Sequence, residues 1–127
     1  MKREAVRTKG APKAIGPYEQ GIRVNGFVFT AGQIALDAKT GKLVDGGIEA
    51  QTREVLENLK AILEAAGSSM DQVVKATVFL KNMADFAAMN EVYEEYLSRS
   101  RPARSTVAVA ELPRGALIEI DIVALVA

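Results

Sequence analysis

The chain of 127 residues contains no cysteine and no histidine. The absence of cysteine excludes a disulfide framework and a thiol nucleophile. The absence of histidine excludes Ser-His-Asp and Cys-His catalysis as well as the usual zinc sites. Several of the commonest catalytic and metal-binding arrangements therefore cannot be built from this sequence.

An excess of charge of either sign is also absent, because 16 Lys and Arg residues balance 16 Asp and Glu residues. A formally neutral chain produces no global field that would attract nucleic acid. The first thirteen residues are locally basic, and this pattern favours a solvated terminal segment. No apolar run approaches the roughly 20 residues that a membrane span requires. The start also lacks the apolar core of a signal peptide, so we expect a cytoplasmic protein.

The residues that are present have the composition of one globular domain, which we expect to span residues 1–127. Hydrophobic residues make up 49% and charged residues 25% of the chain, as is typical of soluble proteins. Asn25-Gly26 lies between two apolar runs and predicts a hairpin, because both residues tolerate positive φ. The Gly-Lys pair of segment 37–42 is followed by Leu43, where a phosphate loop requires Ser or Thr, so this segment is interpreted as a turn.

Helical periodicity extends over residues 47–66, where apolar residues recur along one stripe. Gly67 stands where a glycine in the left-handed conformation commonly ends a helix. A strand is predicted over residues 73–80. Its expected inner face carries Val74, Val78 and Leu80.

Asn82 is placed to cap a second helix whose third position is Asp85. The Arg-Pro pair at 101–102 ends that segment, and two further strands are predicted over residues 103–110 and 116–126. The order of hairpin, helix, strand, helix, strand and strand is typical of an α+β domain with both helices packed on one face of a sheet.

The last predicted strand presents two different faces. One face is aliphatic and is expected to carry the helices: Ile118, Ile120, Ile122 and Val126. The other face mixes aliphatic and acidic residues: Leu117, Glu119, Asp121, Val123 and Leu125. A solvated face rarely holds so many large aliphatics, and a fully buried face rarely holds two acids. We therefore expect this mixed face to be buried against another subunit, with a polar site in it.

Arg104 and Glu119 are the candidate catalytic residues. Arg104 is suited to grip a planar carboxylate through two parallel hydrogen bonds, and its alternative role is a structural ion pair with Glu119 or Asp121. Glu119 is flanked by aliphatic residues and could be partly desolvated with a raised pKa, or neutralised by a nearby cation. If the last two strands pair with Ala110 opposite Leu117, Arg104 and Glu119 are roughly 13 Å apart. The two residues could then flank a ligand only if they come from neighbouring subunits.

Three other segments have candidate binding roles. Residues 16–18 form a turn that carries Tyr18 and could cover a pocket, and a loop pinned by the tyrosine is the alternative. Residues 30–33 end a strand with small side chains, where the backbone could approach a ligand closely. Asn90 lies in the second helix, where plain exposure is the alternative.

Four short motifs stand in order along the chain: Ala14-Ile15-Gly16-Pro17-Tyr18, Ala31-Gly32-Gln33, Pro102-Ala103-Arg104-Ser105 and Ile118-Glu119-Ile120-Asp121. Residues 58–67 and 78–81, followed by Phe86 and Asn90, add to them. Together these segments resemble the RidA (YjgF) family. The resemblance covers essentially the whole chain at the family's spacing, and the ordered set is highly specific.

The resemblance implies a chorismate-mutase-like fold, in which a mixed sheet carries two helices on one face. It implies a homotrimer with the sheets inward and three pockets between subunits. The implied activity is that of a 2-iminobutanoate/2-iminopropanoate deaminase, which hydrolyses reactive enamines and imines such as 2-aminoacrylate to 2-oxo acids and ammonia. These intermediates leak from pyridoxal-phosphate-dependent dehydratases. The family implies no cofactor and no metal. The balanced charge and the lack of a long apolar run predict neither a nucleic-acid nor a membrane partner.

By the same resemblance, Arg104 matches the arginine that binds the substrate carboxylate, and Glu119 matches the acid that orients or activates the attacking water. The matched substrate-binding positions are Tyr18, Ala31, Gly32, Asn90 and Thr106. Some family members have serine in place of Ala31 and cysteine in place of Thr106. Neither position supplies a nucleophile in this reaction, so we expect the activity to survive these departures while the preferred imine stays open.

Two other functions are compatible with the same pocket. A non-enzymatic module could hold a small carboxylate there for regulation or for chaperone-like protection. A ribonuclease activity is attributed to the family at large. It is disfavoured by the zero net charge, the absence of histidine and the lack of a basic stripe with interleaved aromatics.

Overall fold

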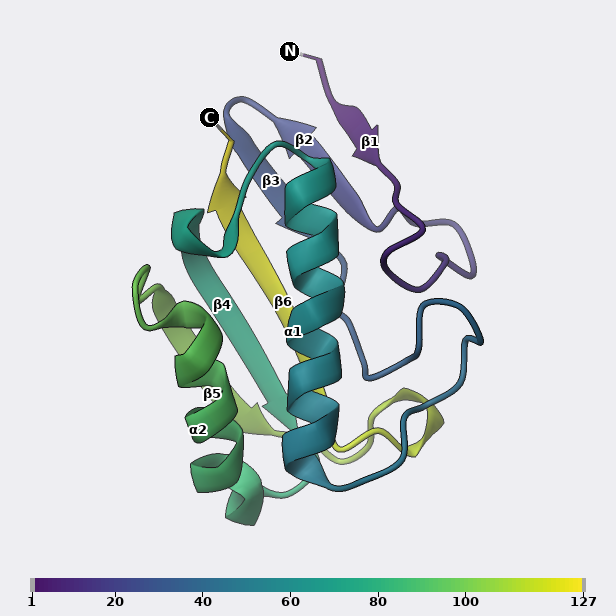
Figure 1. The fold of residues 1–127 in the computed structure, drawn as a ribbon, viewed down its shortest axis with the longest axis vertical. Helices are drawn as coiled ribbons and strands as arrows, with labels where there is room; N and C mark the ends of the chain where they lie inside the picture. Colours follow the sequence, from purple (N-terminus) through teal and green to yellow (C-terminus); the bar gives the residue numbers. More distant parts are fainter. Residues whose placement is uncertain (1, 127) are drawn as a thin grey trace.

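The computed structural model of the protein describes residues 2–126. Six strands form one mixed sheet in the order β1-β2-β3-β6-β4-β5, and two helices lie across one of its faces (Figure 1). The strands are β1 (Glu4–Val6), β2 (Gly21–Val24), β3 (Phe27–Thr30), β4 (Val73–Leu80), β5 (Ala103–Ala108) and β6 (Ile118–Leu125). The helices are α1 (Ile48–Ala65) and α2 (Phe86–Leu97), with short 3-10 turns η1 (Met70–Gln72), η2 (Met83–Asp85) and η3 (Pro113–Gly115). The expected α+β fold with a mixed sheet and two helices is confirmed.

The hairpin between β2 and β3 turns at Asn25 and Gly26, whose φ angles are 52° and 81°. This confirms the turn that the Asn-Gly pair predicts. The first thirteen residues differ from the solvated segment expected there, because Glu4–Val6 pairs antiparallel with β2 and Val6 is buried. A three-residue strand with one inward side chain has no detectable periodicity. Its pairing depends on contacts more distant in the sequence.

Helix α1 buries its apolar stripe against the sheet, and five of its aliphatic side chains are fully buried: Val55, Leu56, Leu59, Ile62 and Leu63. Gly67 ends the helix with φ of 83°. The Ser68 amide donates to the Leu63 carbonyl at 2.8 Å, and the Gly67 amide donates to Glu64 at 3.1 Å. These two bonds form a Schellman motif, so the predicted C-terminal glycine is confirmed.

Strand β4 has the predicted bounds, but Val74 does not point to the inner face as predicted. The register with β6 shifts between Val73 and Lys75, which is the signature of a bulge. Val73 is therefore buried while Val74 is 38% exposed, and strict alternation resumes only after the bulge. A bulge of this kind leaves no mark in a simple alternating pattern.

The start of the second helix also differs from its prediction. Asn82 makes no side-chain capping bond, and Met83–Asp85 forms the separate 3-10 turn η2 before α2 begins at Phe86. The backbone carbonyl of Asn82 accepts from the Asp85 amide at 3.1 Å instead. The chain thus turns tightly from β4 into α2 without a side-chain cap.

The last two strands do not pair with each other, so the expected register of Ala110 opposite Leu117 is wrong. Strand β6 lies between β3 and β4 and is antiparallel to both, whereas β5 pairs in parallel with β4 at the sheet edge. The unit β4-α2-β5 is therefore a crossover of the kind that parallel strands require. The placement has an energetic reason, because the inner face of β6 is aliphatic and a central position buries all of it.

The face of the sheet opposite the helices is called the open face here. It carries partly exposed apolar side chains: Phe29, Val74, Val107 and Leu125. The acids Glu119 and Asp121 lie on the same face, since Ile118, Ile120 and Ile122 point to the helices. The mixed face predicted for the last strand is confirmed within one chain.

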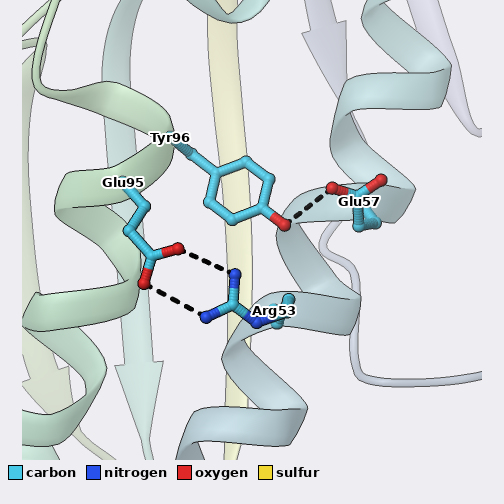
Figure 2. Close-up of polar contacts among 4 residues, drawn as sticks. All are labelled: Arg53, Glu57, Glu95 and Tyr96. Carbon is cyan, nitrogen blue, oxygen red and sulfur yellow. Dashed lines mark hydrogen bonds and ion pairs between the residues drawn. The ribbon is translucent and has the colours of Figure 1, made fainter.

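Polar contacts on the outer surface fix the two helices to each other (Figure 2). Arg53 of α1 donates to both carboxylate oxygens of Glu95 on α2, at 2.9 and 3.1 Å. The Tyr96 hydroxyl donates to Glu57 at 2.6 Å, and burial, followed by this contact, raises the pKa of Tyr96 to about 12. Exposed pairs contribute little stability, so their main effect is to hold the helices in register.

Candidate functional site

Arg104 lies on β5, on the face of the sheet that the helices cover. Its Nη1 donates to Oδ1 of Asn90 at 2.7 Å. The guanidinium carbon lies 4.6 Å from the ring centroid of Tyr93 and 5.4 Å from that of Phe86. These distances are typical of cation–π contacts. Three side chains of α2 therefore fix the orientation of the guanidinium.

A hollow of about 710 Å³ opens beside this arginine, and we call it the Arg104 hollow. Its lining includes Asn90, Tyr93, Arg101, Pro102 and Arg104. Among residues 2–126, Arg104 forms no ion pair with a carboxylate. The predicted alternative of a structural pair with Glu119 or Asp121 is therefore wrong. A cation fixed in direction without an anionic partner is suited to bind a carboxylate.

Tyr93 adds a further polar atom to the Arg104 hollow. Its side chain is buried, and within the described part of the chain its hydroxyl has no hydrogen-bond partner. Burial raises the pKa of Tyr93, and the charge of Arg104 partly offsets this rise. Buried hydroxyls without a partner are uncommon, so this donor is unused hydrogen-bonding capacity beside Arg104.

Glu119 lines a second hollow of about 180 Å³ on the other side of the sheet, which we call the Glu119 hollow. Its lining includes Lys13, Tyr18, Gly32, Gln33, Arg114 and Glu119. Gly32 packs so closely on the acid that an added Cβ would lie 2.8 Å from Cδ of Glu119. Gln33 holds the segment in place by exchanging two backbone bonds with Ile120, at 2.9 and 3.1 Å.

The environment of Glu119 favours its neutral form. Burial raises the pKa of Glu119, and the nearby Asp121 raises it further. Burial also raises the pKa of Asp121, partly offset by Lys75. No cation among residues 2–126 forms an ion pair with Glu119, so the alternative of a neutralised acid is wrong. A carboxyl with a raised pKa is suited to accept a proton and to return it.

The two hollows lie on opposite faces of the sheet. Arg104 is in register with Ala76, and Ala76 is in register with Ile122, so Arg104 shares the inner face. Glu119 is in register with Phe79 on the open face. Within one chain, therefore, the structure brings Asn90 to Arg104 and separates both from Glu119.

The other predicted substrate-binding residues lie in different parts of the structure. Tyr18 is 51% exposed, and its hydroxyl accepts from the Ile15 amide at 3.3 Å, so the loop is pinned by its own tyrosine. Ala31 follows β3, and its amide donates to the Gln20 carbonyl at 2.9 Å. Thr106 shares the face of Arg104, and within residues 2–126 its buried Oγ1 has no hydrogen-bond partner.

The sequence reading missed the aromatic rings that hold the arginine. The resemblance includes Phe86 without a role at the site, and Tyr93 is not among the predicted site residues. The spacing of Phe86, Asn90 and Tyr93 follows the turns of a helix and places all three on one side. This spacing was the signal that could have identified them. Asn90 lies within a stripe of aromatic residues, and that side of the helix faces the strand that carries Arg104.

Gln20 is a second residue that the sequence reading did not single out. The side chain is 4% exposed. Its Oε1 accepts from the Thr8 amide at 2.7 Å, and its Nε2 donates to the Pro12 carbonyl at 2.8 Å and to the carbonyls of Ala11 and Thr8 at 3.2 and 3.1 Å. One amide thus holds the loop that forms a wall of the Glu119 hollow.

We expect Gln20→Leu to lower the free energy of unfolding by about 3 kcal/mol, because it removes the side-chain partner of four backbone groups that are buried or part-buried. Urea denaturation measures this change. Gln72→Leu, at an exposed position, is the matched control and should change the stability by no more than about 0.5 kcal/mol. Equal effects of the two substitutions would contradict the anchoring role of Gln20.

None of the helices in residues 2–126 is long and apolar enough to cross a membrane. No group of three or more Asp or Glu side chains in this part of the chain is arranged to hold a metal ion.

Comparison with known proteins places these features in a family. Residues 8–126 match the family described as Endoribonuclease L-PSP. A RutC family protein of Pyrococcus horikoshii is 57% identical over 122 residues, covering 96% of this chain and 97% of the relative. The chloroplastic Reactive Intermediate Deaminase A of Arabidopsis thaliana is 46% identical over 124 residues, covering 98% of this chain and 66% of the relative.

The solved structures agree. The crystal structure of TdcF from E. coli with bound serine superimposes with a TM-score of 0.91 at 41% identity, covering 98% of this chain and 99% of that one. The similarity thus extends over the whole sheet and both helices. The chain belongs to the Endoribonuclease L-PSP family, which is the RidA (YjgF) family that its motifs resemble.

Proposed function

We propose that the protein hydrolyses reactive enamines and imines of small amino acids, such as 2-iminopropanoate and 2-iminobutanoate, to 2-oxo acids and ammonia. The observation that carries this proposal is the guanidinium of Arg104, which Asn90 and two aromatic rings orient and which no carboxylate of residues 2–126 neutralises. Support also comes from the name of the Arabidopsis relative and from the serine bound to TdcF, since serine carries the same carboxylate as these imines.

The proposed reaction uses two side chains, Arg104 and Glu119. Arg104 holds the substrate carboxylate, so that the imine carbon lies beside a water positioned by Glu119. Glu119 accepts a proton as the water oxygen bonds to that carbon, which gives a carbinolamine. Glu119 then gives this proton to the nitrogen. As the C–N bond breaks, the hydroxyl of the carbinolamine returns a proton to Glu119 and becomes the carbonyl, and ammonia leaves. No cofactor or metal takes part in this scheme.

The site is proposed to lie between subunits of a homotrimer. Arg104 and Glu119 occupy opposite faces of the sheet within one chain, so Arg104 of one subunit would act with Glu119 of the partner subunit. The open face supports the assembly, because its exposed apolar residues would be covered. The number of subunits follows from the family resemblance. A monomeric mass in light scattering would contradict this arrangement.

A coupled assay tests the proposal. A serine or threonine dehydratase generates the imine in place, and trapping with semicarbazide competes with hydrolysis by this protein. Faster release of the 2-oxo acid supports the deaminase. Tight carboxylate binding without turnover would favour the non-enzymatic module instead.

The family description names an endoribonuclease, so RNA is tested alongside. The neutral chain without histidine disfavours that activity. If the protein cleaves single-stranded RNA and does not hydrolyse either imine, the nuclease function is supported and the deaminase function is rejected.

We expect Glu119→Gln to lower kcat/KM for imine hydrolysis by about tenfold to 100-fold, which reaches the lower end of the roughly 100-fold to 10,000-fold contribution typical of general acid–base catalysis. In the unaltered protein the rate should rise with pH through the raised pKa of Glu119, because the carboxylate is the base. The glutamine variant should lose this acidic limb. Stopped-flow rates across pH measure both effects, and an unchanged pH profile would exclude Glu119 as the proton carrier.

The same substitution should not damage the fold. A carboxyl whose pKa is raised by folding favours its protonated form in the folded state, so ionised Glu119 opposes folding at neutral pH. That penalty appears as the pH rises through the raised pKa. Glu119→Gln should therefore keep or raise the melting temperature at pH 7, which separates a catalytic loss from unfolding.

A further inference from the structure

Two cations line the Glu119 hollow together with the acid, namely Lys13 and Arg114. Among residues 2–126 neither forms an ion pair with a carboxylate. The hollow therefore has more positive charge in its walls than the described chain balances.

Arg114 is held in place by its backbone and by a neighbouring turn. It lies in the 3-10 turn η3 with φ of 60° and ψ of 22°, a left-handed conformation that non-glycine residues seldom adopt. Its Nη1 donates to the Gly41 carbonyl at 3.1 Å. Strained backbone of this kind persists where the surroundings determine it and occurs often at ligand sites.

Arg114 is exposed, and acceptors of the described residues satisfy only a small part of its hydrogen-bonding capacity. A guanidinium has five N–H donors, and the Gly41 carbonyl is the acceptor that the described residues supply. The open donors can form the paired bonds that a planar carboxylate accepts. Lys13, from the loop on the other wall, adds a second positive charge to the same hollow.

We propose that Arg114, assisted by Lys13, selects imino acids whose side chain ends in a second carboxylate. This inference rests on the proposed function, in which Arg104 of the partner subunit holds the carboxylate common to all substrates and Glu119 holds the water. Arg114 and Lys13 have no role in that reaction, so they are available to bind a negative charge at the far end of the substrate. The hollow, at about 180 Å³, is smaller than typical drug-sized pockets and suits a short side chain.

The test compares two imines generated in place by amino-acid oxidases, one from alanine and one from aspartate. The aspartate-derived imine carries the second carboxylate, and the alanine-derived imine does not. We expect Arg114→Gln to lower kcat/KM for the aspartate-derived imine by about tenfold to 100-fold, as for loss of hydrogen bonds to a charged group. The rate with the alanine-derived imine should change less than about threefold, well below the loss of one such bond. Arg114→Lys should restore part of the loss.

Two controls accompany this comparison. Lys60→Gln removes an exposed cation of α1 that does not line the Glu119 hollow, and it should alter neither rate. Arg114→Gly removes the guanidinium at a position where glycine accepts the positive φ without strain. It should reproduce the selectivity of Arg114→Gln even if the glutamine variant folds poorly.

The outcomes separate the inference from the function on which it rests. If the unaltered protein hydrolyses neither imine, the proposed function fails. If both imines are hydrolysed and Arg114→Gln lowers both rates equally, Arg114 acts on the common carboxylate or on long-range attraction, and the selectivity is refuted. Unchanged rates with both imines would refute it as well.

Discussion

Arg104→Ala is expected to lower kcat/KM for imine hydrolysis by about 100-fold or more, while the protein stays folded and assembled. The substitution removes two bonds to a carboxylate, each of which contributes about 1.5–3 kcal/mol when one partner is charged. The substrate would then reach the hollow without a fixed orientation, so the imine carbon would rarely lie beside the held water. Steady-state rates in the coupled assay measure the loss.

The structure provides controls for this experiment. Arg104→Lys keeps the charge but loses the planar fork and the stacking on Tyr93 and Phe86, so it should recover little of the activity. Arg99→Ala removes an exposed arginine whose contact is a 3.7 Å pair with Asp71, and its rate should stay near that of the unaltered protein. Activity of Arg104→Ala within twofold of the unaltered protein would exclude the carboxylate anchor.

Elements with strong local signals were predictable from the sequence. The Asn25-Gly26 turn, the stripe of α1 and the end of that helix at Gly67 depend on residues close together in the chain. Backbone conformation at such positions follows from a few side chains, such as a glycine that accepts positive φ. The same holds for the inner face of β6, where isoleucines alternate without interruption.

Elements that depend on distant partners were not predictable in the same way. The alternation within β5 puts Arg104 and Thr106 on one face, but it carries no information about which strand lies beside β5. The insertion of β6 between β3 and β4 is decided by the burial of a whole aliphatic face. The short strand β1 and the bulge near Val74 likewise depend on their neighbours.

The candidate site shows the same division. The chemistry of Arg104 and Glu119 suggested their roles, and the surroundings of both now support a free cation and an acid with a raised pKa. The assumed register placed them roughly 13 Å apart along a hairpin. The real topology places them on opposite faces, which makes a site within one chain far less suitable than one between chains.

Gly32→Ala is the second substitution with a large expected effect on activity. The added Cβ would lie 2.8 Å from Cδ of Glu119, closer than real Cβ atoms approach a neighbour, and 3.1 Å from Cγ, which is a tight contact. The backbone at Gly32 cannot shift easily, because the next residue, Gln33, exchanges two backbone hydrogen bonds with Ile120. The carboxyl group must therefore move, and a displacement of about 1 Å at a reacting group can cost about 100-fold in rate.

The fold should tolerate this change, because what moves is the far end of one flexible side chain. We expect a loss of about tenfold to 100-fold in kcat/KM with a melting temperature close to that of the unaltered protein. Gly47→Ala is the matched control, since an added Cβ there meets nothing within 4 Å and the rate should not change.

A double variant decides whether Gly32 acts through Glu119. If the glycine matters only because it leaves room for the acid, combining Gly32→Ala with Glu119→Gln should cost little more than the worse single change. Additive losses would show that Gly32 acts on the substrate directly, by leaving its backbone open to the ligand. If Gly32→Ala has the rate of the unaltered protein, the activity does not depend on the position of the Glu119 carboxyl. That result would contradict the role of Glu119 in holding the water.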